Sequence, residues 1–308
     1  MKVFITGASG YIGSNVAQAF RRAGHEVWGL VRDEKKAWML RENEIHPVIG
    51  RMEEPGSYSG PAGGCQVLVH AALQMHGDTA GLDNMTVDSL LSLSGTGPCP
   101  KTLIYTSGCW VYGNTKGEIA DETSALSPPS LVAWRPAVER KALGTSGTRG
   151  IVIRPGCAYG RQERLFGIWM SDAQKGDHLS VIGDGVNRWC AVHVDDLADG
   201  YLRAAESGLS GEIFNLADPS RQRVSELVEA IACAADYKKD IRYVPVGEAE
   251  RQLGPFAECL ALDQHVDSRK AETLLGWRPR HTGFADEAEI FFEAWKAHAA
   301  KAESPVGV

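Results

Sequence analysis

Three glycines near the N-terminus restrict what this chain can fold into more than any other feature. Residues 3–5 form an apolar run typical of a buried strand, and residues 12–20 repeat apolar side chains at helical spacing. Gly7, Gly10 and Gly13 lie in the turn between them. Such glycines allow a sharp turn, a close approach of a pyrophosphate and tight packing of the helix, whose free amide groups bind phosphate. The pattern predicts a dinucleotide site; the alternative is a tight turn without a ligand.

Strands and helices alternate along the first half of the chain, which predicts a parallel sheet. Strand-like runs lie at residues 25–31, 47–50, 65–72, 101–107 and 150–155. Ligands of such sheets bind at the carboxyl ends of the strands. Five candidate site residues fall at these ends: Gly7, Arg32, Ala71, Ser107 and Pro155.

The pattern changes in the second half, where strand-like and helical segments mix with irregular ones. We therefore predict an α/β fold, a Rossmann-type doubly wound parallel sheet with a smaller C-terminal substrate lobe. Residues 1–165, completed by roughly 188–217, would form the dinucleotide-binding domain, and residues 166–187 and 218–301 would form the lobe. The polar tail 302–308 is expected to be disordered.

The end of the second predicted strand indicates which cofactor binds. An acidic residue there would hold the ribose hydroxyls of NAD, whereas an arginine would hold the 2′-phosphate of NADP. Arg32 stands first after the strand, with Lys35 and Lys36 close behind. We therefore expect NADP (NADPH) in preference to NAD. Asp33 keeps the opposite assignment open, and a solvated charge cluster is the remaining alternative.

Composition and charge exclude several classes of partner. The 308 residues are 44% hydrophobic and 23% charged, as in a globular protein with a sizeable core. A net charge of −7 argues against nucleic acid or an anionic membrane as the main partner. No apolar run approaches a membrane span, and the early glycines interrupt any signal-peptide core. Seven scattered cysteines, none in a C-x-x-C pair, favour reduced thiols in a cytoplasmic protein over disulfides or a metal site.

Several motifs, taken together, resemble the extended short-chain dehydrogenase/reductase family of sugar-nucleotide epimerases, dehydratases and dihydroflavonol-type reductases. The resemblance covers nearly the whole chain. Its motifs are Thr6-Gly-Ala-Ser-Gly-Tyr-Ile-Gly13, His70-Ala-Ala72, Tyr105-Thr-Ser107, Val111-Tyr-Gly113, Arg154-Pro155, Tyr159-Gly160, His193-Val-Asp-Asp-Leu197, Phe214-Asn-Leu216 and Leu274-Leu-Gly-Trp-Arg-Pro279.

The resemblance implies a dinucleotide cofactor, a small-molecule substrate and a homodimer. The cofactor-binding positions that it implies, together with those at strand ends, are Gly7, Ser9, Gly10, Tyr11, Ile12, Gly13, Arg32, Met52, Ala71, Ala72, Thr106, Arg135, Pro155 and Gly156.

The catalytic residues of that family do not align. The family uses a Ser or Thr and a Y-x-x-x-K pair, in which the tyrosine moves a proton and the lysine lowers its pKa. Aligned on the flanking motifs, the serine position falls on Gly108, the tyrosine position on Leu131 and the lysine position on Arg135. Arg135 can still bind ribose hydroxyls or phosphate, but it is a poor proton shuttle. The only formal Y-x-x-x-K match, at residues 112–116, lies in a glycine-rich loop and is interpreted as coincidence.

Other residues must then supply the proton and contact the substrate. Ser107, Tyr112 and an ordered water are the candidate donors, although both side chains also suit purely structural roles. Cys109, Trp110 and Tyr159 are candidate substrate contacts, with core packing as the alternative. Their character favours an apolar substrate over a sugar nucleotide.

Three functions remain open from the sequence. The first is an NAD(P)-dependent oxidoreductase acting on a small, apolar carbonyl substrate with a non-standard proton donor. The second is a non-redox isomerase, dehydratase or cyclase on the same scaffold. The third is a cofactor-binding regulator without turnover.

Overall fold

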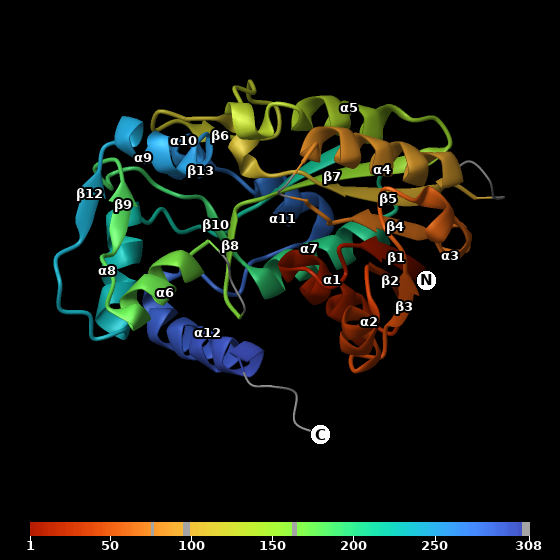
Figure 1. Cartoon of the computed structure of the whole chain (residues 1–308). Coiled ribbons are helices and arrows are strands. Elements are labelled where there is room, and N and C mark those ends of the chain that lie inside the picture. The colour runs from red at the N-terminus through yellow and green to blue at the C-terminus, as the bar shows by residue number, and fades with distance from the viewer. Residues whose placement is uncertain (75–76, 95–98, 162–164, 304–308) are drawn as a thin grey trace.

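A seven-stranded parallel sheet forms the centre of the computed structural model, which describes residues 1–74, 77–94, 99–161 and 165–303 (Figure 1). Its strand order is β11-β7-β5-β4-β1-β2-β3, and every neighbouring pair is parallel. The strands are β1 (Lys2–Thr6), β2 (Glu26–Val31), β3 (His46–Ile49), β4 (Val67–His70), β5 (Lys101–Thr106), β7 (Thr148–Pro155) and β11 (Glu212–Leu216). The predicted Rossmann-type α/β fold is confirmed.

Helices cover both faces of this sheet because its strands are apolar on both sides. In β1, Val3 and Ile5 pack into one core cluster, while Phe4 between them packs into the cluster on the opposite face. The first face carries α1 (Tyr11–Arg22), α2 (Glu34–Arg41), α7 (Val194–Glu206) and α11 (Arg269–Leu275). The second carries α3 (Ser59–Gly63), α4 (Thr79–Ser94) and α5 (Arg135–Gly144). Figure 1 shows α4 and α5 above the sheet and α1, α2 and α7 below it.

A third core cluster lies beside the sheet and is rich in aromatic rings. It packs mainly between α6 (Gly167–Lys175), α8 (Val224–Ala234) and α12 (Ala288–Glu303). Short strand pairs lie around it: β8 (Cys157–Tyr159) with β10 (Ala191–His193), and β9 (Ser180–Ile182) with β12 (Arg242–Val244). The remaining elements are β6 (Ile119–Ala120) paired with β13 (His265–Val266), α9 (Val246–Leu253), α10 (Phe256–Leu260), and the 3₁₀ turns η1 (Pro55–Ser57), η2 (Cys109–Tyr112), η3 (Ser130–Val132) and η4 (Ala285–Glu287).

The predicted lobe boundaries differ from the packing in two places. Ala271, Leu275 and Trp277, assigned to the second lobe, pack into the core on the α1 face of the sheet. Helix α12 runs to Glu303, so the tail predicted at 302–308 would begin inside that helix, and 304–308 lie outside the described residues. The division into two domains therefore stays a prediction.

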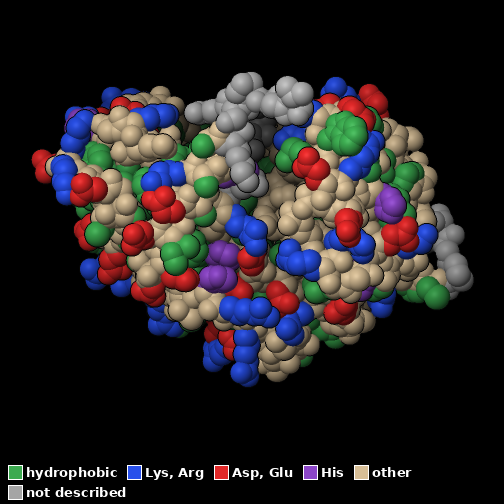
Figure 2. Space-filling view, turned by 90° about the horizontal axis from the view of Figure 1, so that it is seen from below, with side chains coloured by type: hydrophobic (Ala, Val, Ile, Leu, Met, Phe, Trp, Pro, Cys, Tyr) green, Lys and Arg blue, Asp and Glu red, His purple; other side chains and the backbone are tan. Residues whose placement is uncertain are grey.

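The surface and the helices agree with the bulk composition. Acidic and basic side chains are interspersed on the face seen in Figure 2. Among the described residues, no helix combines the length and apolar character that a bilayer crossing requires. All seven thiols are free.

Candidate functional site

The glycine turn after β1 has the geometry that a dinucleotide needs. Gly7 has a φ of +74°, and a Cβ built on it would lie 2.7 Å from the carbonyl oxygen of Ala71. A Cβ on Gly13 would overlap the carbonyl of Gly7. Gly10 is the N-cap of α1 and provides no side-chain cap, so the first amide groups of the helix remain available to an anion. The residues present therefore fit a bound dinucleotide.

The other predicted cofactor positions lie in this turn or near the carboxyl-end edge of the sheet. The Tyr11 hydroxyl donates to the carbonyl oxygen of Gly160 at 2.8 Å, which fixes the start of α1 against the loop after β8. The Thr106 hydroxyl accepts from Tyr201 at 2.7 Å. The remaining positions along this edge are half-buried: Ser9, Ile12, Met52, Ala71, Ala72 and Gly156. Their side chains and backbone are thus within reach of solvent and of a ligand.

At the end of β2, the two candidate selectivity residues have different surroundings. Asp33 is the N-cap of α2, and its carboxylate accepts from the amide of Lys36 at 2.8 Å. Arg32 is exposed, as is Lys35. The carboxylate is therefore engaged locally, whereas the arginine is available to a ligand.

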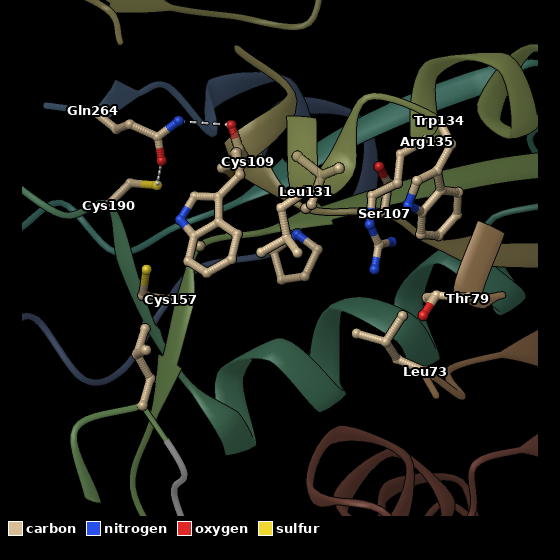
Figure 3. A pocket seen from close by; sticks show the side chains of 16 residues that line it. Leu73, Thr79, Ser107, Cys109, Leu131, Trp134, Arg135, Cys157, Cys190 and Gln264 are labelled. Carbon is tan, nitrogen blue, oxygen red and sulfur yellow. Dashed lines mark hydrogen bonds between the residues drawn. The ribbon is translucent and has the colours of Figure 1, made fainter. Parts of the chain in front are cut away.

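A cavity of about 260 Å³ lies at the carboxyl ends of β5 and β7 (Figure 3). It brings together six predicted site residues from three separate stretches of the chain: Ser107, Cys109, Trp110, Arg135, Pro155 and Gly156. Gly108 and Leu131 line it as well. The positions that aligned with the catalytic serine, tyrosine and lysine thus meet in one pocket, although two of them carry no titratable group.

Arg135 is the only charged side chain among the described residues that line this pocket. It is the first residue of α5, followed by Pro136, which suits a first helical turn because its missing N–H would have no partner there. Its Nη1 donates to the carbonyl oxygen of Thr106 at 2.7 Å, and its guanidinium lies 4.8 Å from the ring centre of Trp134. These contacts fix the guanidinium at the wall of the pocket.

Ser107 supplies the free hydroxyl of the pocket. Its backbone N–H donates to the carbonyl oxygen of Ile153 at 2.8 Å, which fixes the residue at the end of β5. Its Oγ is buried and has no hydrogen-bond partner within the described part of the chain. Buried hydroxyls are normally paired, so this one suits a ligand oxygen.

Two predicted site residues are not in the pocket. The hydroxyl of Tyr112 donates to Asn215 and accepts from Arg154, each at 2.8 Å, and burial raises its pKa. Tyr112 is therefore not a suitable proton donor. Tyr159 is fully buried and packs against Phe166 and other rings of the aromatic cluster. The prediction that it contacts substrate is thus corrected to a core role.

Other pocket residues could not have been found from the sequence. Gln264 donates from Nε2 to the carbonyl oxygens of Cys109 and Gly113, both at 2.9 Å, and accepts from the thiol of Cys190. Cys157 also lines the pocket, and burial raises the pKa of the Cys109 and Cys157 thiols. They are neutral thiols rather than nucleophiles. No local motif marks Gln264, because Cys109 and Gly113, whose carbonyl groups it contacts, are about 150 positions earlier in the chain.

Comparison with known proteins identifies the family. The model of the NAD dependent epimerase/dehydratase family matches residues 3–217. The chain belongs to this family. The resemblance to the extended short-chain dehydrogenases/reductases is thereby confirmed.

Relatives with a similar sequence and fold extend over nearly the full length. An uncharacterized protein of Schizosaccharomyces pombe is 28% identical over 291 residues, covering 92% of this chain and 96% of that one. A 4-hydroxy-2-methyl-3-oxo-4-farnesyl-3,4-dihydroquinoline-1-oxide ketoreductase of Stigmatella aurantiaca is 23% identical and covers 84% and 80%. The structure of dTDP-glucose 4,6-dehydratase from Bacillus anthracis, in complex with NAD, superimposes with a TM-score of 0.84 at 21% identity, covering 97% and 98%. This last likeness shows the fold.

Proposed function

We propose that this chain is an NADP(H)-dependent oxidoreductase acting on a small, apolar carbonyl compound, without a tyrosine proton donor. The observation that carries the proposal is the pocket, where Gly108 and Leu131 stand in place of the catalytic hydroxyls and Ser107 keeps a free one. Its walls are mainly apolar, with two tryptophans and three cysteines among them. The Stigmatella aurantiaca relative, a ketoreductase of a farnesylated ring ketone by its name, supports this substrate class.

The residues that would hold the cofactor follow from the fold. The turn at residues 7–13 binds the pyrophosphate, Arg32 contacts the adenosine end, and Ala71 with Pro155 flank the path to the pocket. Gly13 allows α1 to pack against this turn without a side chain in between. When bound, the cofactor supplies or accepts the hydride of the reaction.

Ser107 holds the substrate oxygen from the protein side. Its Oγ hydrogen bonds to that oxygen and gives it the hydroxyl proton. A water molecule returns a proton to the serine, because a serine hydroxyl does not ionise readily by itself. Loss of a dedicated general acid costs roughly 10²- to 10⁴-fold in rate, so turnover is expected to be slow. Slow turnover is consistent with a site that still orients its substrate well.

The test is oxidation of NADPH, followed by its absorbance, with a panel of apolar ketones, enones and imines. We expect turnover with at least one compound, and a decrease of roughly 10²-fold in kcat for Ser107→Ala. Ser92→Ala, which removes an exposed hydroxyl of α4, is the matched control. A panel without any oxidation, on protein that binds NADPH, would favour the non-redox alternative. Unchanged kcat in Ser107→Ala would exclude this serine as the donor.

A further inference from the structure

Arg135 carries a buried charge that the described part of the chain does not neutralise. Its side chain is 8% exposed, and no described carboxylate forms an ion pair with it. The buried carboxylates of α4 and of α5 itself are already engaged. Asp83 hydrogen bonds with a histidine and a tyrosine, and Glu139 forms a bidentate pair with Arg154. A buried charge without a partner is costly, so a compensating anion is expected nearby.

The contacts of Arg135 orient its guanidinium without compensating the charge. The carbonyl oxygen of Thr106 and the ring of Trp134 are neutral partners. A guanidinium has five N–H donors in a planar fork, and the Thr106 carbonyl accepts from only Nη1. The remaining donors favour an anionic group in the pocket, either a planar carboxylate or a single anionic oxygen.

The unpaired hydroxyl of Ser107 independently favours a ligand oxygen at the same place. Its buried Oγ lacks a partner among the described residues, and the residue lines the same cavity. Figure 3 shows Ser107 and Arg135 at one end of the pocket, and Gln264, Cys190 and Cys157 at the other. The polar groups of Gln264 are all engaged with protein atoms. The free donors are therefore concentrated at one end.

The rest of the cavity sets the size and character of the ligand. A cavity of roughly 150 Å³ lined by apolar side chains accommodates one benzene molecule. The present cavity of about 260 Å³ therefore has room for a ligand of one or two rings. Leu131, Trp110 and Leu165 provide apolar walls for it.

We propose that this pocket binds an apolar, ring-sized compound with one ionised oxygen group, which Arg135 and Ser107 hold at the α5 end. The proposal deepens the proposed function, because this compound would be its substrate or product. A carboxylate and an enolate or phenolate share the required chemistry. With an enolate or phenolate, the oxygen is the one that Ser107 contacts in the proposed reaction; with a carboxylate, Ser107 binds the ligand and water supplies the proton. Ribose hydroxyls of the cofactor would accept a hydrogen bond from Arg135 but would not neutralise its charge. If Arg135 binds the anionic compound, its replacement weakens anion binding; if Arg135 binds the ribose, its replacement weakens cofactor binding.

Calorimetric titration of the full-length protein separates these cases. The probes are cinnamate and 4-nitrophenolate, each against its neutral counterpart, cinnamamide and nitrobenzene, with and without saturating NADPH. We expect the anions to bind better than the neutral compounds. Arg135→Gln should weaken anion binding roughly 10- to 100-fold, and Arg135→Lys, which keeps the charge, should weaken it less. Ser107→Ala should weaken it by about threefold to tenfold. Preference for cinnamate over 4-nitrophenolate would identify a carboxylate, and the reverse an enolate-like oxygen.

Arg140→Gln is the matched control, because Arg140 lies on the same helix and is exposed. NADPH affinity, measured in the same titrations, should change less than threefold in Arg135→Gln. An equal loss of NADPH and anion binding would overturn the proposal, because Arg135 would then belong to the cofactor. Wild-type protein that binds anions no better than their neutral counterparts would overturn it too. Failure of the proposed oxidoreductase function appears separately, as absent turnover in protein that still binds these anions.

Discussion

Arg154, at the end of β7, is held in a buried network that supports one wall of the pocket. Its Nε and Nη2 donate to the two carboxylate oxygens of Glu139 at 3.0 and 2.6 Å, and its Nη1 donates to Tyr112. Its carbonyl oxygen accepts from the Cys109 thiol at 3.2 Å. Arg154 thus ties β7 and α5 to η2, the turn that carries Cys109 and Trp110.

Replacing Arg154 with methionine leaves Glu139 as a buried, unpaired charge. We expect Arg154→Met to lower the free energy of unfolding by about 3–5 kcal/mol, measured by urea denaturation. The double variant Glu139→Leu/Arg154→Met should regain most of this loss, because no isolated charge remains. If the single and double variants had the same free energy of unfolding, the unpaired charge of Glu139 would not be the cause of the loss.

Single residues could be predicted from the sequence where the backbone conformation or the available space admits only one residue type. The turn glycines were found in this way, since the φ of Gly7 and the close contact at Gly13 leave no room for a side chain. Tyr112 could not be placed, because its partner Asn215 lies 103 positions away and no local pattern reports such a contact. The pocket role of Gln264 was missed for the same reason.

Elements were predicted more accurately than their ends. Six strands of the main sheet were found from apolar runs, whereas the start of α5 at Arg135 and the separate turn η3 before it were not marked by the sequence. Leu131 consequently lies on a 3₁₀ turn and Arg135 at a helix start. The helical spacing of a Y-x-x-x-K pair is thus missing here, in addition to its side chains.

The junction of β2 and α2 carries the cofactor preference. Because Asp33 caps α2 with its carboxylate, we expect Arg32 to dominate the contact with the adenosine ribose. Arg32→Ala should weaken NADPH binding roughly 10- to 100-fold with little change in NADH binding, as measured by titration. Arg22→Ala, which removes an exposed charge at the far end of α1, serves as the control. Equal weakening of both cofactors would show that the NADP preference is wrong.

At the scale of the whole molecule, the late part of the chain completes the first core. Trp277 is fully buried in the cluster on the α1 face of the sheet, and its Nε1 donates to the carbonyl oxygen of Asp196 at 2.8 Å. The predicted division assigns residues 218–301 to the lobe, and a composition pattern does not report which core a segment packs against. The two halves are therefore expected to unfold together.

Trp277→Ala tests this coupling. The cavity left behind should lower the free energy of unfolding by about 3–5 kcal/mol. Circular dichroism and the fluorescence of the remaining tryptophans should report one coincident transition in both proteins. Trp38→Ala is the control, because Trp38 is 60% exposed and its removal should change stability little. Two separate transitions in the wild type would show that the lobes fold independently.

The position of Gln264 in the chain has a consequence for biosynthesis. Chains emerge from the ribosome N-terminus first, and early segments begin to fold before later ones exist. The glycine turn is among the first segments to emerge, but the carbonyl groups of Cys109 and Gly113 receive their Gln264 partner only when most of the chain has been made. A nascent or prematurely ended chain would thus present the phosphate-binding turn before the ligand pocket exists.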